Sequence, residues 1–212
     1  MRISELASLA ETPLSAVKYY QREGLLPEGE KSAPNQTSYG AEHVQRVKLV
    51  RALLVTGGLS IAATKEVIAA LDSSSLPEAF GVAQHAMSAP RANEPTASEE
   101  SRKRITQLAQ TQGWAHTDVN PGIEAAARAL DGLAAIGFDA PDSYLSSYAR
   151  AAHEAAQADL RALADLPSVE QATELMVVGT VLGDPLFAGL RRLAQQDATY
   201  NQFSPELKGT RP

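Results

Sequence analysis

The sequence predicts a mainly α-helical protein built in two parts. Hydrophobic residues make up 44% of the 212 residues, whereas aromatic residues make up only 5%, and 37 residues are alanine. A core made mostly of alanine, leucine, valine and isoleucine favours packed helices over a β-sandwich. The length fits one large domain or two small ones, which can bury a core without disulfide bonds.

The charge is divided unevenly along the chain. The formal net charge is −6, yet residues 1–72 carry eight basic and eight acidic side chains. Residues 73–212 carry eleven basic and seventeen acidic side chains, which accounts for the whole acidic excess. The asymmetry indicates two halves with different tasks, and it leaves the N-terminal half neutral.

The composition also excludes several classes of protein. The chain has no cysteine, which rules out zinc–thiolate sites, iron–sulfur clusters, disulfide scaffolds and cysteine nucleophiles. The first residues lack the apolar run of a signal peptide. The longest uncharged apolar run, Leu175–Gly183, has about half the length of a membrane span. We therefore expect a soluble, cytoplasmic protein without a membrane partner.

Two short helices are predicted at the start of the chain. The apolar residues of the first helix are spaced for one face: Ile3, Leu6, Ala7 and Leu9. Thr12 is suited to cap the second helix, with Pro13 at its first position and Gly24 at its end. The side chains of the second helix and its end that we expect to point inward are Leu14, Val17 and Leu25.

A hairpin and two further helices follow. Residues 26–38 are rich in Pro, Gly, Ser, Asn and Gln, which predicts a short β-hairpin. The third helix should end at the Gly57-Gly58 pair. Its expected apolar face is Val44, Val47, Val50 and Leu54, and that of the fourth helix is Ile61, Val67, Ile68 and Leu71.

The rest of the chain is predicted to be helical around one linker. A short helix is expected over residues 77–87, and residues 88–98 read as a linker with two prolines. Its expected buried face is Phe80, Ala83 and Met87. Asn120 and Pro121 are expected to start a helix that ends at Gly137. Further helices are expected over about residues 141–166 and after a Ser168/Gln171 capping box. Residues 183–185, Gly-Asp-Pro, are predicted to separate that last helix from a final pair.

These elements give three predicted segments. Residues 1–72 form a winged helix-turn-helix with a short β-hairpin wing. Residues 73–97 form a connecting or dimerisation helix and the linker, and residues 98–212 form an all-helical domain for effector binding and dimerisation. In a winged helix-turn-helix, the second helix enters the major groove of DNA and flanking elements contact phosphates.

The second helix carries side chains suited to DNA. Lys18 and Arg22 lie one turn apart on its exposed face, beside Ser15, Ala16 and Tyr19. A small hydroxyl and a small apolar group suit base edges, and cations suit the phosphate backbone. From the pattern alone, a plain solvated helix is the alternative.

Short motifs make the interpretation more specific. The segment Lys18–Leu26 (KYYQREGLL) resembles the recognition helix and turn of the MerR family of bacterial transcription regulators. The opening ISELA resembles the first helix of that family. Tyr39 with residues 43–47 (HVQRV) resembles the end of its wing and its third helix, and residues 57–61 (GGLSI) resemble its turn into helix four. The resemblance covers about residues 1–72.

The chain departs from the family pattern at several positions. Ser15 and Lys18 stand where the family commonly has arginine, and Gln21 stands where it commonly has glutamate. Residues 36–38 also lack the arginine that usually precedes the wing tyrosine. Fewer fixed cations predict a shallower salt dependence of DNA binding. Including two candidate neutral phosphate contacts in the wing, the predicted DNA-binding residues are Ser15, Ala16, Lys18, Tyr19, Arg22, Asn35, Gln36 and Tyr39.

The family resemblance implies partners as well as a fold. It implies a homodimer on a pseudo-palindromic promoter site, with the DNA bent and untwisted, and it makes RNA polymerase a candidate partner. Matching two-fold symmetry in protein and operator follows from geometry. The family usually dimerises through one long helix after helix four. The corresponding helix here, residues 77–87, is short, so the interface is expected to extend into the C-terminal half.

The C-terminal half is the candidate sensor. Without cysteine, and with four histidines that lack metal-ligand spacing, neither a metal nor a cofactor is expected. A small organic effector remains, and the hydroxyls of Tyr144 and Tyr148, one turn apart, suit a mixed polar and apolar pocket. Ordinary core packing is the alternative for these side chains. The candidate ligand-binding residues are Trp114, Tyr144, Tyr148, His153 and Phe187.

The sequence therefore predicts a dimeric, non-enzymatic transcription regulator whose helical half biases how the N-terminal half reads DNA. No phosphate-binding loop, metal-ligand spacing or catalytic triad spacing indicates an enzyme. Two alternatives stay open. One is a ligand-sequestering protein with a vestigial DNA-binding half. The other is an architectural DNA-bending protein without an effector, which predicts no ligand-sized cavity in residues 98–212.

Overall fold

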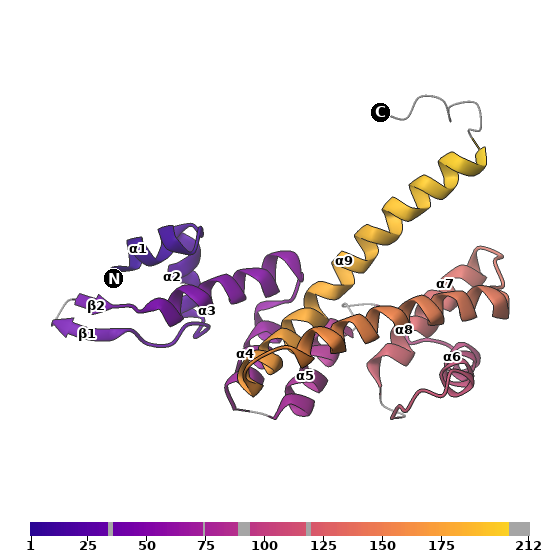
Figure 1. Ribbon diagram of the computed structural model, residues 1–212, viewed down its shortest axis with the longest axis horizontal. Coiled ribbons are helices and arrows are strands. Elements are labelled where there is room, and N and C mark those ends of the chain that lie inside the picture. The colour runs from indigo at the N-terminus through magenta and orange to yellow at the C-terminus, as the bar shows by residue number, and fades with distance from the viewer. Residues whose placement is uncertain (34–35, 74, 89–93, 118–119, 204–212) are drawn as a thin grey trace. The chain divides into compact units, whose positions relative to one another are not determined.

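The computed structural model describes residues 1–33, 36–73, 75–88, 94–117 and 120–203 (Figure 1). The first helices and the hairpin are α1 (Ile3–Leu9), α2 (Leu14–Arg22), β1 (Glu30–Ala33), β2 (Gln36–Ser38), α3 (Ala41–Arg51), the π-helical turn η1 (Ala52–Thr56) and α4 (Ile61–Ser73). The later helices are α5 (Leu76–Ser88), α6 (Glu99–Thr111), α7 (Pro121–Ala135), α8 (Asp142–Ala164) and α9 (Val169–Phe203). The predicted fold class, a winged helix-turn-helix followed by helices, is confirmed.

Residue contacts group the described chain into two compact units. One unit contains residues 1–61 together with the described part of 178–212, and the other contains residues 62–177. Packing alone does not show which segments fold independently. The boundaries expected at residues 72 and 97 therefore stay predictions.

The core of the N-terminal unit joins α1, α2 and α3. Fully buried side chains from each helix meet there, because each helix turns one apolar stripe inward. The most buried of them are Leu6, Val17, Leu25, Val47, Val50 and Leu53. Three expectations about this core were wrong in detail. Leu9 is 57% exposed and Leu14 is 37% exposed. Leu53, three residues after Val50, replaces Leu54 as the buried leucine, since a step of three keeps a side chain on the same helical face as a step of four does.

Glycines end the helices where the sequence indicated. Gly24 has φ +72°, and the Leu25 amide donates to the Tyr20 carbonyl, 2.9 Å away, so the left-handed residue closes α2. Gly137, with φ +83°, follows α7 in the same way. The start of α2 differs from the expectation. Pro13 is the capping residue, while the buried Thr12 hydroxyl donates to the Ala10 carbonyl at 2.9 Å and stabilises the preceding turn.

In the second unit, carboxylates of α7 hold the segment that precedes α6. Asp131 accepts hydrogen bonds from the Ser98 amide, the Ser98 hydroxyl and the Ser101 hydroxyl, at 2.6–2.7 Å. Glu124 accepts from the Ala97 amide and from Arg102 Nε, both at 2.7 Å. These hydrogen bonds lower the pKa of both carboxyl groups, because they favour the charged form.

In α5, Ala83 is buried as expected, whereas Phe80 and Met87 are half-buried.

The last helix corrects one prediction. No break occurs at residues 183–185, because α9 continues through Pro185. Proline has a helical φ and removes one backbone hydrogen bond, and the helix formers that follow it (Leu, Ala, Arg and Gln) sustain the helix. The continuous helix also lengthens the apolar run. Among the described residues, Val169–Gln202 is the one helix that could span a membrane by length and composition, with mean hydropathy 1.3 and 17% of that window buried.

Candidate nucleic-acid interface

A side chain of α3 holds the turn between α1 and α2 in place. Glu11 has φ +50°, a left-handed conformation in a residue other than glycine. Arg51, near the end of α3, donates through Nη1 to the Glu11 carbonyl at 2.5 Å and lies 3.5 Å from the Ala10 carbonyl. A charged donor on carbonyls that no helix satisfies stabilises this tight turn. The angle between α1 and α2 is therefore set by three helices together.

The exposed face of α2 presents the predicted cations. Lys18, Arg22 and Ser15 are exposed, while Ala16 and Tyr19 are half-buried. The guanidinium carbon of Arg22 lies 5.1 Å from the centre of the Tyr19 ring, a cation–π contact that orients the cation. The residues of α2 that hold it against the core are Val17 and Tyr20. Burial raises the pKa of the Tyr20 hydroxyl, and the Arg51 charge lowers it by less.

The base of the wing is tied to α2 and to the N-terminus. Gln21 Nε2 donates to the Tyr39 hydroxyl at 3.1 Å. The Met1 ammonium donates to the Tyr39 carbonyl at 2.8 Å and to the Ser38 hydroxyl at 3.2 Å, and the Tyr39 amide donates to the Met1 carbonyl at 2.9 Å. The strands β1 and β2 pair antiparallel, with Lys31 opposite Thr37. The wing is thus positioned by contacts outside its own hairpin.

The predicted wing residues differ in what the structure says of them. Tyr39 is 6% exposed and packs edge-on against His43, with ring centres 5.2 Å apart. Its contact with DNA stays a prediction, and its observed contacts position Gln21. Gln36 begins β2, whereas Asn35 lies outside the described residues. Sequence reasoning did not predict the hydrogen bond of Gln21 to Tyr39 or those of Arg51 to the turn between α1 and α2, because nothing local to these residues indicates such distant partners.

The C-terminal candidates fall into separate groups. The Trp114 and His153 rings stack, with centres 6.3 Å apart and planes 15° apart. Tyr144 and Tyr148 lie on another face of α8, with their hydroxyls 3.2 Å apart, and Phe138 packs against Tyr144. Phe187 belongs to the other unit. Four of the five candidates therefore form two separate pairs, Phe187 belongs to neither pair, and the predicted ligand site stays a prediction.

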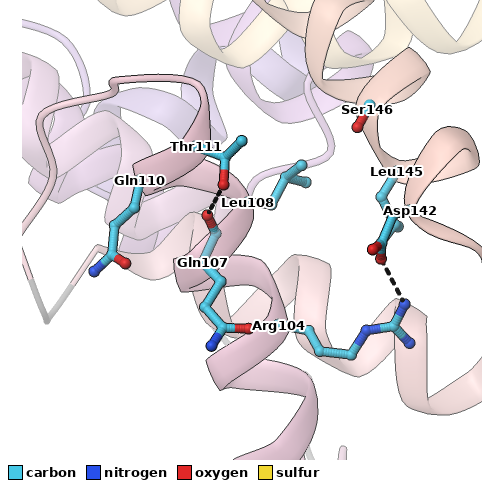
Figure 2. Close-up of a pocket in the computed structure, with 8 residues that line it drawn as sticks. All are labelled: Arg104, Gln107, Leu108, Gln110, Thr111, Asp142, Leu145 and Ser146. Carbon is cyan, nitrogen blue, oxygen red and sulfur yellow. Dashed lines mark hydrogen bonds and ion pairs between the residues drawn. The ribbon is translucent and has the colours of Figure 1, made fainter.

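A cavity of about 390 Å³ lies between α6 and α8 (Figure 2). Its lining comes from Arg104, Gln107, Leu108, Gln110 and Thr111 of α6, and from Asp142, Leu145 and Ser146 of α8. Figure 2 shows Arg104 directed toward Asp142, with Nη2 and Oδ1 3.5 Å apart. Arg104 also donates to Asp139 at 2.9 Å and to the Ala140 carbonyl at 2.7 Å. None of these residues is among the predicted ligand contacts.

The fold and the exposed face of α2 define a winged helix-turn-helix of the kind that reads DNA. Residues 1–71 match the family model of the MerR HTH family of regulatory proteins, which confirms the predicted resemblance over this part of the chain. The crystal structure of SCO5550 from Streptomyces coelicolor A3(2), described as a putative transcriptional regulator, is similar over 96% of this chain and 98% of its own. The two share 26% sequence identity, with a TM-score of 0.71. No curated protein matches the chain.

Proposed function

We propose that the protein is a transcription regulator that binds a pseudo-palindromic promoter site as a homodimer. The observation that carries the proposal is the face of α2, where Lys18 and Arg22 are exposed beside Ser15 on a MerR-type domain. A dimer presents two such helices to successive major grooves, which fits a site with two-fold symmetry. Promoter DNA is then the main partner, RNA polymerase at the same promoter is a second, and the site of action is the cytoplasm. No catalytic role is proposed.

Binding to DNA depends on few cations in this proposal. Residues 1–72 are neutral overall, so general attraction to phosphates is weak and positioned side chains matter more. Replacing Lys18 or Arg22 with alanine should remove about one phosphate or base contact per half-site. Each such loss reduces affinity on the order of 5- to 150-fold when bases are read.

The test is fluorescence anisotropy or gel shift with DNA from the protein's own promoter region. Lys18→Ala and Arg22→Ala should weaken binding while circular dichroism stays unchanged. Lys103→Ala is the matched control, because Lys103 is an exposed cation on α6. Wild-type affinity in both α2 variants would contradict the assignment of the recognition helix. If the wild-type protein gives no shift at low salt, the ligand-sequestering alternative is favoured instead.

The cavity between α6 and α8 supports a small polar effector. Its volume of about 390 Å³ lies within the roughly 300–1,000 Å³ range of small-molecule pockets. The two leucines offer an apolar surface, and amide, hydroxyl and guanidinium groups surround it. This cavity favours effector binding over the architectural alternative. Leu108→Trp should fill the cavity, and it should abolish any ligand-induced rise in melting temperature without changing DNA affinity in the absence of ligand.

A further inference from the structure

The turn between α1 and α2 contains a residue whose backbone conformation its side chain disfavours. Glu11 has φ +50°, and a left-handed backbone is costly for residues other than glycine. The amides of this turn bond to nearby carbonyls: the Glu11 amide donates to Ser8 at 3.1 Å, and the Thr12 amide donates to Ala7 at 3.0 Å. The Glu11 carbonyl accepts instead from a side chain forty residues away in the sequence.

That side chain is Arg51, the half-buried last residue of α3. Its Nη1 lies 2.5 Å from the Glu11 carbonyl oxygen and 3.5 Å from the Ala10 carbonyl oxygen. A charged donor bonds a carbonyl more strongly than a neutral donor does, and a disfavoured backbone conformation persists only where surrounding contacts enforce it. Arg51 also lies close enough to α2 for its charge to act on Tyr20. One guanidinium group therefore holds the turn and lies beside the helix that follows it.

The π-helical turn η1 begins directly after Arg51. The Gly57 amide donates to the Ala52 carbonyl at 2.8 Å, and this bond across five residues closes η1. Short π-helical turns are rare in proteins, and those that occur lie frequently at functional sites. Arg51 keeps a helical backbone, with φ −62° and ψ −43°, so α3 and η1 form one continuous helix. The shape of η1 therefore affects where the side chain of Arg51 lies.

Helix α9 packs against the residue that closes η1. Val181 is fully buried, and a Cβ at residue 57 would collide with its Cγ1 methyl and lie 2.8 Å from the Leu53 carbonyl oxygen. Gly57 has φ −77°, which any residue can adopt, so glycine is needed here for close approach. Residues 1–61 and the described part of 178–212 form one compact unit. The contact between α9 and η1 therefore lies in the same unit as α2.

We propose that Arg51 is a positioning residue for α2 in DNA binding, and that α9 controls it through Gly57 and η1. The proposal rests on the proposed function, since its readout is affinity for DNA. It concerns the orientation of α2 and names no new contact with bases or phosphates. A change along α9 that alters the fit of Val181 on Gly57 would then alter how α2 presents its cations.

The length of α2 makes its orientation sensitive to the turn before it. Its nine residues span about 13 Å at roughly 1.5 Å per residue. A tilt of about 10° at Glu11 would move Arg22, at the far end of α2, by about 2 Å, which exceeds the tolerance of a direct hydrogen bond. Lys18 is nearer the turn and would move about half as far. Small changes at the turn therefore have measurable effects on DNA affinity.

The first test measures the DNA affinity of the full chain and its salt dependence. Arg51→Gln should weaken binding to promoter DNA about 10-fold, because it removes a charge-assisted hydrogen bond. The slope of log affinity against log salt should equal that of wild type, whereas loss of a phosphate contact reduces the slope by about 1 for each contact. Lys48→Gln is the matched control, since Lys48 is an exposed cation on α3, and it should bind DNA like wild type.

Two outcomes of this test contradict the positioning role. A reduced salt slope in Arg51→Gln would identify a direct phosphate contact. Wild-type affinity in Arg51→Gln would show that the turn keeps its shape without the guanidinium group. Circular dichroism at the temperature of the binding assay shows that each variant is folded.

The second test separates positioning of α2 from a loss of folding. Glu11→Gly allows the left-handed conformation at no steric cost, so the turn should keep its shape with less help from Arg51. In the Glu11→Gly background, Arg51→Gln should weaken DNA binding by less than about 2-fold, because the two residues act as one unit. The same loss of affinity in both backgrounds would mean that Arg51 does not act through the turn.

The third test asks whether α9 acts through Arg51. Val181→Ala removes the methyl groups that pack on Gly57, and it should weaken DNA binding about 3-fold. In the Arg51→Gln background, Val181→Ala should cause no further loss, because coupled residues are not additive. Val169→Ala is the matched control, since Val169 is a 72% exposed valine at the start of α9, and it should bind DNA like wild type. Wild-type affinity in Val181→Ala, or additive losses, would overturn control by α9.

The outcomes separate this inference from the proposed function. If wild type does not bind promoter DNA, the proposed function fails and this inference fails with it. If wild type binds DNA and Lys18→Ala weakens binding while Arg51→Gln does not, the regulator stands and only this inference fails.

Discussion

The N-terminal core, formed by α1, α2, α3 and η1, and the middle turns of α9 contain the same kinds of apolar side chain but differ in how those side chains are covered. In the N-terminal core, Leu6, Val17 and Leu53 are fully buried, because these short helices cover one another. In α9, Leu190 and Leu193 remain more than half exposed among the described residues. Hydrophobic periodicity is present in both regions, but only the first has its partner within the described chain. A stripe therefore predicts that a helix has a partner, and it does not say which molecule supplies that partner.

Replacing one leucine in each region tests this difference in burial with the largest expected effect. Leu53→Ala should destabilise the folded chain by about 2–5 kcal/mol, because it leaves a cavity in a packed core. Leu193→Ala should leave the stability of the monomer close to wild type, because its side chain already contacts water. Urea denaturation at a protein concentration that favours the monomer measures both free energies of unfolding. An equally large loss of stability in Leu193→Ala would mean that the monomer itself covers Leu193.

A glycine from each region gives the next largest effect. Gly57→Ala should destabilise by about 1–3 kcal/mol, because its Cβ would collide with Val181 and would lie 2.8 Å from the Leu53 carbonyl. Gly189→Ala should stabilise by about 0.5–1 kcal/mol through helix propensity, since no heavy atom lies within 4 Å of its Cβ position. Opposite signs in thermal unfolding would support packing of α9 at Gly57 and exposure at Gly189. A stabilising Gly57→Ala would contradict that packing.

Local chemistry made much of the fold predictable. Asn120 with Pro121 predicted the start of α7, and Gly24 and Gly137 predicted where α2 and α7 end, because capping and left-handed φ depend on neighbouring residues alone. The exposed cations of α2 were also predictable, since Lys18 and Arg22 share a helical face. These features need no knowledge of the distant chain.

Features that depend on distant contacts were not predictable in the same way. Pro185 indicated a break, yet α9 continues through it. Both Leu53 and Leu54 lie on the side of the helix that Val50 buries, and Leu53 is the one that the structure buries. Arg51 reaches a carbonyl forty residues away in sequence. The cavity-lining residues of α6 share a helical face, but most of them are polar, so the sequence does not distinguish that face from a solvated one. Tertiary packing decided each of these cases.

In the second unit, the carboxylate of Asp131 tests how much polar contacts contribute to stability. Asp131→Asn should lower the melting temperature by a few degrees near pH 7, because the amide replaces a carboxylate that accepts three hydrogen bonds. The folded pKa of Asp131 is lowered, so its contribution is complete above the ordinary value of 3.8 and is lost as the pH falls through the lower folded value. The difference between variant and wild type should therefore shrink below about pH 4.

Trp114 is the single tryptophan of the chain and follows α6, so its fluorescence can report this unfolding directly. Asp159→Asn, at an exposed aspartate on α8, is the control and should match wild type at every pH. A deficit in Asp131→Asn that is as large at pH 3 as at pH 7 would show that the charge is not what holds Ser98 and Ser101.

The smallest expected effect concerns how firmly exposed cations are held in the two regions. Arg22 lies over the Tyr19 ring, whereas Nη1 of Arg191 on α9 lies 3.4 Å from Gln195 Oε1. A cation–π contact at an exposed site is worth about 0.5–1 kcal/mol, so Tyr19→Leu should weaken DNA binding roughly 2- to 5-fold. Tyr19→Phe keeps the ring and should retain wild-type affinity. Equal weakening in both variants would mean that the Tyr19 hydroxyl itself contacts DNA, as the sequence predicts for this residue, and that ring stacking contributes little.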